Sequence, residues 1–216
     1  DGTLIRPPEF LPLAIQAQLT VALDRGVIRK VFGWLADNPE ALRRTHKCSL
    51  NLSGLTMSDG SIAGFVREQR ALRGIPAEKI ESEAIRNPGA ASRLGDDLKA
   101  EGFRIALDDF GTGLATFEYL KRFPLDYLKI DGSFIRNLVT NPIDEEIVLS
   151  TVRVARRLNV KTIAEHVHSQ AICDRVRSLG VEYIQGEVIG TAIPIAELFG
   201  QTKAEPTRSD ARSTVV

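Results

Sequence analysis

The chain has 216 residues, a length that predicts one domain, and its 43% apolar and 26% charged residues are ordinary for a globular protein with a hydrophobic core. Its 28 Lys and Arg residues balance 28 Asp and Glu residues, and this zero formal charge argues against a protein that binds a DNA or RNA duplex. No apolar run is long enough for a membrane span, no signal peptide opens the chain, and Cys48 and Cys173 lack the spacing of metal ligands. We therefore expect a soluble, cytoplasmic domain with neither a disulfide framework nor a zinc site.

The predicted elements alternate between short apolar strands and amphipathic helices. In chain order they are one or two helices from Pro8 to Ala36, strand Cys48–Ser53, helix Ile62–Gly74, helix Ala90–Gly102, strand Phe103–Phe110, strand Tyr127–Asp131, helix Asp144–Asn159, strand Val160–Val167, a helix from an N-cap at Ser169 to Gly180, and strand Val181–Val188. The stretch from Thr202 to Val216 has no apolar periodicity, so we expect a domain over residues 1–200 and a disordered tail over 201–216.

Most predicted strands are followed by a helix, which is typical of parallel βαβ units. Their nearly continuous apolar character agrees, because parallel strands are buried on both faces. An open doubly wound sheet and a closed (β/α) barrel both satisfy this pattern. No glycine-rich dinucleotide-binding motif follows the early strands, and this weakens the case for the open sheet.

Each predicted strand carries a polar residue near its end, although a buried parallel strand should be apolar throughout. These residues are Asn51, Asp108, Asp109, Lys129, Asp131, Glu165 and Gln185. One such residue would more often cap a helix or brace a turn. Five strands with the same feature indicate a site, because the carboxyl ends of barrel strands meet at one rim.

The residue types at this rim suit phosphoryl chemistry. Asn, Asp and Glu oxygens favour hard cations such as Mg²⁺ or Mn²⁺, and shared carboxylates suit a two-metal centre. Asp108 and Asp109 are adjacent, so we expect the second to bend inward with the turn at Gly111. Lys129 would supply positive charge to a phosphate or an attacking hydroxide, with a simple ion pair to Asp131 or Asp109 as the alternative. Asp126 is expected to face solvent.

The strand ends belong to motifs that occur in a fixed order: Asn51-Leu52-Ser53, Leu107-Asp108-Asp109-Phe110-Gly111-Thr112-Gly113, Leu128-Lys129-Ile130-Asp131, Ala164-Glu165 and Gln185-Gly186. Together they resemble the EAL-domain family of bacterial phosphodiesterases, which linearise cyclic di-GMP on a modified TIM barrel. The resemblance extends to about residue 199 and includes intervals of 20 positions from Asp109 to Lys129, 36 to Glu165 and 20 to Gln185.

The resemblance implies a role for each strand-end residue. Mg²⁺ or Mn²⁺ would be held by Asn51, Asp108, Asp109 and Glu165. Lys129 and Glu165 would lie near the hydrolytic water, so that the catalytic residues are Lys129, Glu165 and Asp109. Asp131 would be a supporting carboxylate at the substrate, and Gln185 would lie near the substrate.

The chain also departs from the family pattern. The Glu-Ala-Leu tripeptide, with the first strand of the barrel, is expected to precede Asp1. The family carries a Glu-x-Thr-Glu strand whose first Glu binds metal and whose second anchors the Asp-Phe-Gly loop. Counting 27 positions back from Asp108 assigns this anchor to Glu81. The stretch from Pro76 to Glu81 is too short for the usual strand, so we expect a deletion or a missing segment there, with Glu78 as a loop residue.

A second departure lies after the strand ending at Ala164. The family's Ala-Glu-Gly-Val-Glu is here Ala164-Glu165-His166-Val167-His168. The two histidines are either extra metal ligands or surface substitutions, and we favour surface substitutions.

Three functions follow from these observations. The leading one is hydrolysis of cyclic di-GMP to linear pGpG, and the second is a degenerate EAL domain that binds the nucleotide or a protein without cleaving it. An unrelated barrel enzyme for a small phosphorylated metabolite would not explain the order of the motifs. The resemblance also allows a homodimer, and fused sensor or diguanylate-cyclase-like domains, which would place the domain at the cytoplasmic face of a membrane if the sensor were membrane-bound.

Overall fold

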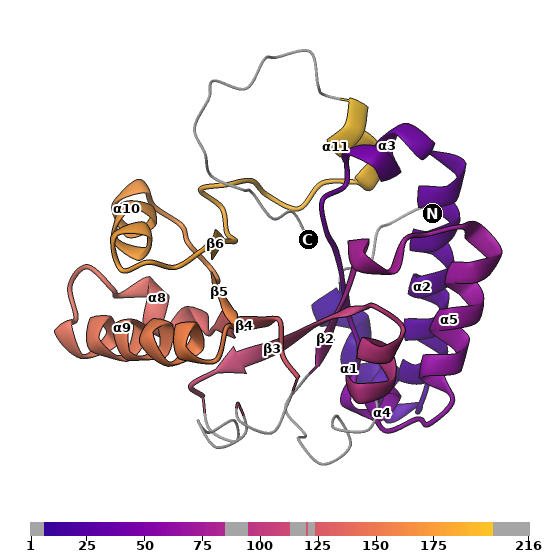
Figure 1. Cartoon of the computed structure of the whole chain (residues 1–216), viewed down its shortest axis with the longest axis horizontal. Helices are drawn as coiled ribbons and strands as arrows, with labels where there is room; N and C mark the ends of the chain where they lie inside the picture. The colour runs from indigo at the N-terminus through magenta and orange to yellow at the C-terminus, as the bar shows by residue number, and fades with distance from the viewer. Residues whose placement is uncertain (1–6, 85–94, 113–119, 121–123, 201–216) are drawn as a thin grey trace.

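The computed structural model describes residues 7–84, 95–112, 120 and 124–200 of the chain (Figure 1). Its strands form one parallel sheet in the order of the sequence: β1 Cys48–Asn51, β2 Ile80–Ala84, β3 Arg104–Phe110, β4 Tyr127–Ile130, β5 Lys161–Ala164 and β6 Tyr183–Ile184. A doubly wound sheet reverses its strand order, whereas a barrel wall keeps it. The sheet therefore confirms the expected α/β barrel architecture, here as a curled wall of six described strands.

Helices lie on the outer side of this wall. They are α1 Pro7–Gln16, α2 Thr20–Asp37, α3 Pro39–Arg44, α4 Gly54–Met57, α5 Ile62–Arg73, α8 Gly132–Arg136, α9 Pro142–Arg157, α10 Gln170–Ser178, α11 Ile195–Gly200 and the short 3₁₀ helix η1 Ala77–Lys79. Figure 1 shows α2 and α5 on the side of β2, and α8, α9 and α10 beside the later strands. In the described part of the chain, each helix is too short or too polar to cross a membrane.

Most predicted helices are present. The first predicted stretch divides into α1 and α2, because Gln18 between them has a φ of 57°. Gly74 ends α5 with a φ of 64°, as expected of a glycine C-cap. The Ser169 side chain accepts a hydrogen bond from the Ile172 N–H and so caps α10. Residues 95–100 are helical, while residues 90–94 and the predicted tail lie outside the described residues.

Strand β2 was not predicted. The stretch before Glu81 is shorter than the usual strand, but β2 begins at Ile80, directly after η1, and pairs in parallel with β1 and β3. Glu81 and Glu83 alternate with Ile80 and Ser82 in this strand. Alternating charges break the apolar run that identifies a buried strand, so the sequence pattern concealed it.

The hydrophobic core lies between the outer face of the sheet and the helices. One cluster joins α2 and α5 to the first strands and includes Phe32, Leu35, Val66, Leu50 and Leu128. A second joins α9 and α10 to the last strands and includes Val148, Val152, Val176, Ile130 and Ile184. Because side chains alternate along a strand, the residues between these outward positions face the barrel interior. The polar strand-end residues therefore face the interior and not the core.

Candidate active site

The predicted strand-end residues lie at one edge of the sheet. Asn51 is the last residue of β1, Asp108 and Asp109 lie near the end of β3, and Glu165 directly follows β5. Lys129 lies in β4, and Gln185 directly follows β6. All six strands are parallel, so these ends share the carboxyl rim, where barrel enzymes carry their active sites.

A β-bulge explains how two adjacent aspartates reach the same site. Leu107 pairs with Leu128 and Phe110 pairs with Ile130, so two residues of β3 lie opposite a single residue of β4. Asp109 has a φ of 50°, which turns the backbone out of the regular pleat. Oxygen atoms of Asp108, Asp109 and Glu165 consequently lie within 4.8 Å of one another. The expected inward bend of the second aspartate is thus present, and the bulge produces it before the turn at Gly111.

The ammonium group of Lys129 lies between two of these carboxylates. Its Nζ atom is 2.9 Å from Asp108 Oδ1 and 2.8 Å from Glu165 Oε1. Lys129 is 3% exposed and Glu165 is 7% exposed, so both ion pairs are largely removed from water. The partners of Lys129 thus include Asp108 and Glu165, neither of which the sequence suggested for a simple ion pair.

The environment of Glu165 is electrostatically unfavourable for a lone carboxylate. Burial raises the pKa of Glu165 above its usual range, and the nearby Asp108 and Asp109 charges raise it further, while Lys129 works in the opposite direction. Three carboxylates share one ammonium group, which leaves an excess of negative charge at the rim. A divalent cation with oxygen ligands fits both this donor set and this charge.

Asn51 lies beside a glutamate that sequence reasoning did not identify. The strand register pairs Asn51 with Glu83 and pairs Glu83 in turn with Ala106, two residues before Asp108. Asn51 is exposed at the rim. The spacing of Glu83, two residues after Glu81 in one strand, is the signal that could have identified it once β2 was recognised.

Glu81 occupies a different place from the one predicted for it. It pairs with Ser49, two residues below the rim, and its side chain is fully buried in the barrel interior. Its carboxylate forms an ion pair of 2.7 Å with Lys47 and accepts a hydrogen bond from the Ser49 hydroxyl. These contacts hold Glu81 in the barrel interior, away from the Asp-Phe-Gly loop, so the spacing count used for that assignment does not match the strand register. Glu78, expected in a loop, lies in the short 3₁₀ helix η1 before the strand.

Asp131 combines two contacts at the start of α8. Its carboxylate accepts a hydrogen bond of 2.8 Å from the Ser133 N–H and caps the helix. Burial acts to raise the pKa of Asp131, but the hydrogen bonds from Ser133, the nearby Arg136 and a contact with Asp109 together lower it. An aspartate at a strand end often serves only to cap the next helix. Asp131 caps α8 and also contacts Asp109.

Asp126, expected to face solvent, is instead largely enclosed. Its carboxylate accepts hydrogen bonds from Lys99, Arg104 and the Ile105 N–H. It therefore joins β3 to the loop before β4 at the end of the sheet opposite the rim.

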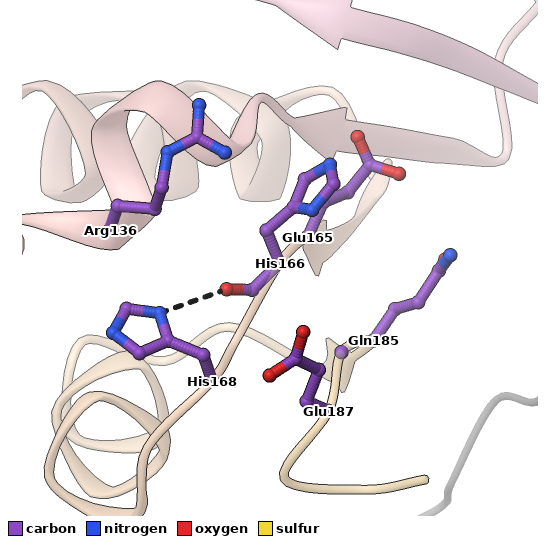
Figure 2. A pocket seen from close by; sticks show the side chains of 7 residues that line it. Arg136, Glu165, His166, His168, Gln185 and Glu187 are labelled. Carbon is purple, nitrogen blue, oxygen red and sulfur yellow. Dashed lines mark hydrogen bonds between the residues drawn. The ribbon is translucent and has the colours of Figure 1, made fainter. Parts of the chain in front are cut away.

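A pocket of about 470 Å³ adjoins the carboxylate cluster (Figure 2). Its lining residues are Arg136, Glu165, His166, His168, Gln185, Gly186 and Glu187. His166 and His168 are exposed, as expected, but they also line this pocket. The carboxylate cluster found among the described residues does not include either histidine.

Comparisons with known proteins agree with this geometry. The family model described as "EAL domain" matches residues 1–192. The chain is 37% identical over 205 residues to the cyclic di-GMP phosphodiesterase PdeB of Shewanella oneidensis, covering 93% of this chain and 24% of that protein. It is also 37% identical over 216 residues to the cyclic di-GMP phosphodiesterase PdeF of Escherichia coli, covering 98% of this chain and 28% of that protein.

A solved structure titled as a complex of the PaMucR phosphodiesterase with c-di-GMP superposes with a TM-score of 0.80 at 31% identity, covering 92% of this chain and 82% of that one. The chain spans about a quarter of the length of the two curated relatives. Since the family model matches most of the chain, the chain belongs to the EAL domain family.

Proposed function

We propose that the chain is a metal-dependent phosphodiesterase that hydrolyses cyclic di-GMP to linear pGpG. The observation that carries the proposal is the buried Lys129 ammonium between Asp108 and Glu165, beside the oxygen cluster that these two residues form with Asp109. The names of the relatives, which share more than a third of their aligned residues with this chain, support the same reaction and substrate.

The ligand set of the proposal is Asp108, Asp109, Glu165 and Asn51, and the strand register places the backbone of Glu83 beside Asn51. Oxygen ligands and excess negative charge favour Mg²⁺ or Mn²⁺. When bound, two such ions would offset the negative charge that grows on the phosphate oxygens as a phosphorus–oxygen bond breaks.

The protein's own groups have separate tasks in this proposal. The Glu165 carboxylate accepts a proton from the attacking water, and Lys129 fixes the orientation of that carboxylate through its 2.8 Å contact. The same ammonium stabilises negative charge on the attacked phosphate. Gln185 lines the pocket and offers its amide to the substrate, while Asp131 supports Asp109.

A second candidate is a domain that binds the nucleotide without cleaving it. With Glu83 as the first residue of the family's Glu-x-Thr-Glu strand, the motif reads Glu83-Ala84-Ile85-Arg86, so its threonine and second glutamate are both replaced. His168 also stands in place of a family glutamate. These substitutions favour a reduced catalytic apparatus, and they are the reason to measure binding together with turnover.

The test is to incubate the protein as encoded, with any flanking segments, with cyclic di-GMP in Mg²⁺, Mn²⁺ or EDTA. We expect pGpG with either ion and none in EDTA. Glu165→Gln should lower the rate by about 10²–10⁴-fold, as expected for loss of a general base. Glu146→Gln, an exposed change on α9, is the matched control and should keep the parental rate. Nucleotide binding by calorimetry without any product would support the receptor instead, and a parental rate in Glu165→Gln would contradict the proposed site.

A further inference from the structure

The ring of His166 packs against Gly132 beside the candidate active site. His166 has a φ of 53°, a conformation that residues other than glycine rarely adopt. Its ring lies against the backbone of Gly132, where an added Cβ atom would be 2.4 Å from His166 Cδ2. The histidine therefore depends on a glycine at the start of α8. A strained backbone retained at an active-site rim is a reason to look for a function of the side chain.

Arg136 extends the same wall of the pocket. It lies four residues after Gly132, so the two positions share one face of α8. Its side chain is exposed and lines the pocket with His166. Among the described residues, no hydrogen bond or ion pair occupies its guanidinium group, which leaves its donors available to a ligand.

The opposite wall of the pocket consists of Gln185, Gly186 and Glu187, and backbone hydrogen bonds join this segment to Val167, which lies between the two histidines. The Val167 N–H donates to the Gln185 carbonyl at 3.1 Å, and the Val188 N–H donates to the Val167 carbonyl at 3.1 Å. Gly186 has a φ of 149°, and an added Cβ atom would be 2.3 Å from Val167 N. The next residue, Glu187, places a carboxylate in the lining, and Figure 2 shows this carboxylate apart from Arg136.

The charges of the lining favour a nucleobase over a second phosphate. Among the described residues that line the pocket, Arg136 is the one arginine or lysine, whereas Glu165 and Glu187 are both acidic. Guanine suits a pocket with an arginine on one wall and a glutamate on the other, because its O6 and N7 atoms accept hydrogen bonds and its N1 and N2 groups donate them. Adenine presents an N6 donor where guanine presents O6, so an arginine fork does not match it. The volume of about 470 Å³ lies within the usual range of small-molecule sites.

We propose that Arg136 and Glu187 form a guanine-selective subsite beside the metal centre, with the His166 ring as a stacking surface for the base. This inference rests on the proposed function, because it assigns one base of the cyclic dinucleotide to the pocket that Glu165 shares. Arg136 donates to O6 and N7, and Glu187 accepts from N1 and N2. The subsite thereby sets which cyclic dinucleotide is placed over the carboxylate cluster.

The experiment compares three substrates in the protein as encoded: cyclic di-GMP, cyclic di-AMP and bis(p-nitrophenyl) phosphate, which has no nucleobase. Arg136→Ala should lower kcat/KM for cyclic di-GMP by about 10- to 100-fold, mainly through KM, because one bidentate base contact is lost. Its rates with the other two substrates should not change. Arg136→Lys should fail to restore the selectivity, since lysine keeps the charge but lacks the planar fork.

Two further variants test the other parts of the subsite. Glu187→Gln should weaken the preference for guanine in the same way as Arg136→Ala. His166→Gly should raise KM for both cyclic dinucleotides equally, because stacking does not distinguish the purines. Arg157→Ala, which removes an exposed arginine from α9, is the control and should leave all three rates unchanged.

Equal losses on both cyclic dinucleotides in Arg136→Ala would show a phosphate contact and overturn the inference. So would a loss on bis(p-nitrophenyl) phosphate or no loss at all. If the parental protein hydrolyses none of the three substrates, the proposed function fails, and the subsite is then judged by calorimetry in EDTA. There, tighter binding of cyclic di-GMP than of cyclic di-AMP, lost in Arg136→Ala, would support the subsite, and equal binding of the two nucleotides would refute it.

Discussion

Lys129 is the residue whose removal should report most clearly on the electrostatics of the site. Lys129→Met keeps a long apolar stem and deletes the ammonium that lies 2.9 Å from Asp108 and 2.8 Å from Glu165. Without it, buried carboxylates lose their cation, which typically costs about 3–5 kcal/mol. For a domain of this size, 1 kcal/mol shifts Tm by about 2–4 °C. In EDTA we therefore expect Tm to fall by about 6–20 °C.

Mg²⁺ should reverse part of this loss, because the ion replaces the missing positive charge. A ligand at about 100 times its Kd stabilises a folded protein by about 2.7 kcal/mol, so a large Mg²⁺-dependent rise in Tm is expected. The rise should be larger in Lys129→Met than in the parent, where the ammonium competes for the same oxygens.

The assay is thermal unfolding followed by circular dichroism in EDTA and in a series of Mg²⁺ concentrations. Lys30→Met, a change at an exposed position of α2, is the control and should behave like the parent. The reasoning would be refuted if Lys129→Met were as stable as the parent in EDTA, or if Mg²⁺ raised both Tm values equally.

Three other substitutions have defined outcomes. Asp109→Asn keeps the side-chain size but removes a charge from the cluster, so hydrolysis at limiting Mg²⁺ should be lost while circular dichroism is unchanged; a parental rate would contradict its role. Asp126→Asn should cost about 1–3 kcal/mol in urea unfolding at pH 7. Burial opposes the low pKa of Asp126, but the hydrogen bond from Lys99 and its other partners outweighs it. Because that pKa is lowered in the folded state, the stabilisation is complete above about pH 4 and lost as pH falls through the folded pKa, so parent and variant should converge in acid; a constant difference would be evidence against this. Gly186→Ala should cost about 1–3 kcal/mol and disturb the pocket, since its Cβ would lie 2.3 Å from Val167 N; an unchanged Tm would show that the close approach can relax.

The sequence predicted the architecture because that information is local. Apolar strands followed by helices predict parallel pairing, and strand-end polar residues predict a shared rim. Asp108, Asp109 and Glu165 were assigned to that rim by this reasoning, and the structure brings their oxygens together. Here the local pattern and the three-dimensional arrangement agree.

Strand β2 shows where this reasoning fails. It carries Glu81 and Glu83, and the buried charge of Glu81 is compensated by Lys47, which lies 4.0 Å from the ring centre of Tyr127 on β4. Contacts of this kind join residues far apart in the chain, so an apolar-run criterion cannot anticipate them. The assignment of Glu81 as the loop anchor failed for the same reason, because spacing alone does not give strand register.

The bulge in β3 and the ion pairs of Lys129 with Asp108 and Glu165 could not be predicted from the sequence either. A glycine after a strand predicts a turn, but it does not reveal that two residues of β3 oppose one residue of β4. That extra residue brings Asp108 and Asp109 to the same site as Glu165. Which residues lie at the site depends mainly on where each strand ends. Which of their side chains contact one another depends on the strand register.

The most direct test of the central claim is hydrolysis of cyclic di-GMP in water enriched in ¹⁸O, with the product analysed by mass spectrometry. The proposed reaction adds one water, breaks one phosphorus–oxygen bond to a 3′ oxygen and leaves a 5′-phosphate. We expect pGpG with a single ¹⁸O atom on that phosphate, formed in Mg²⁺ or Mn²⁺ and not in EDTA. Failure to form a linear product from a protein that still binds the nucleotide would contradict the enzyme, as would a product without the label.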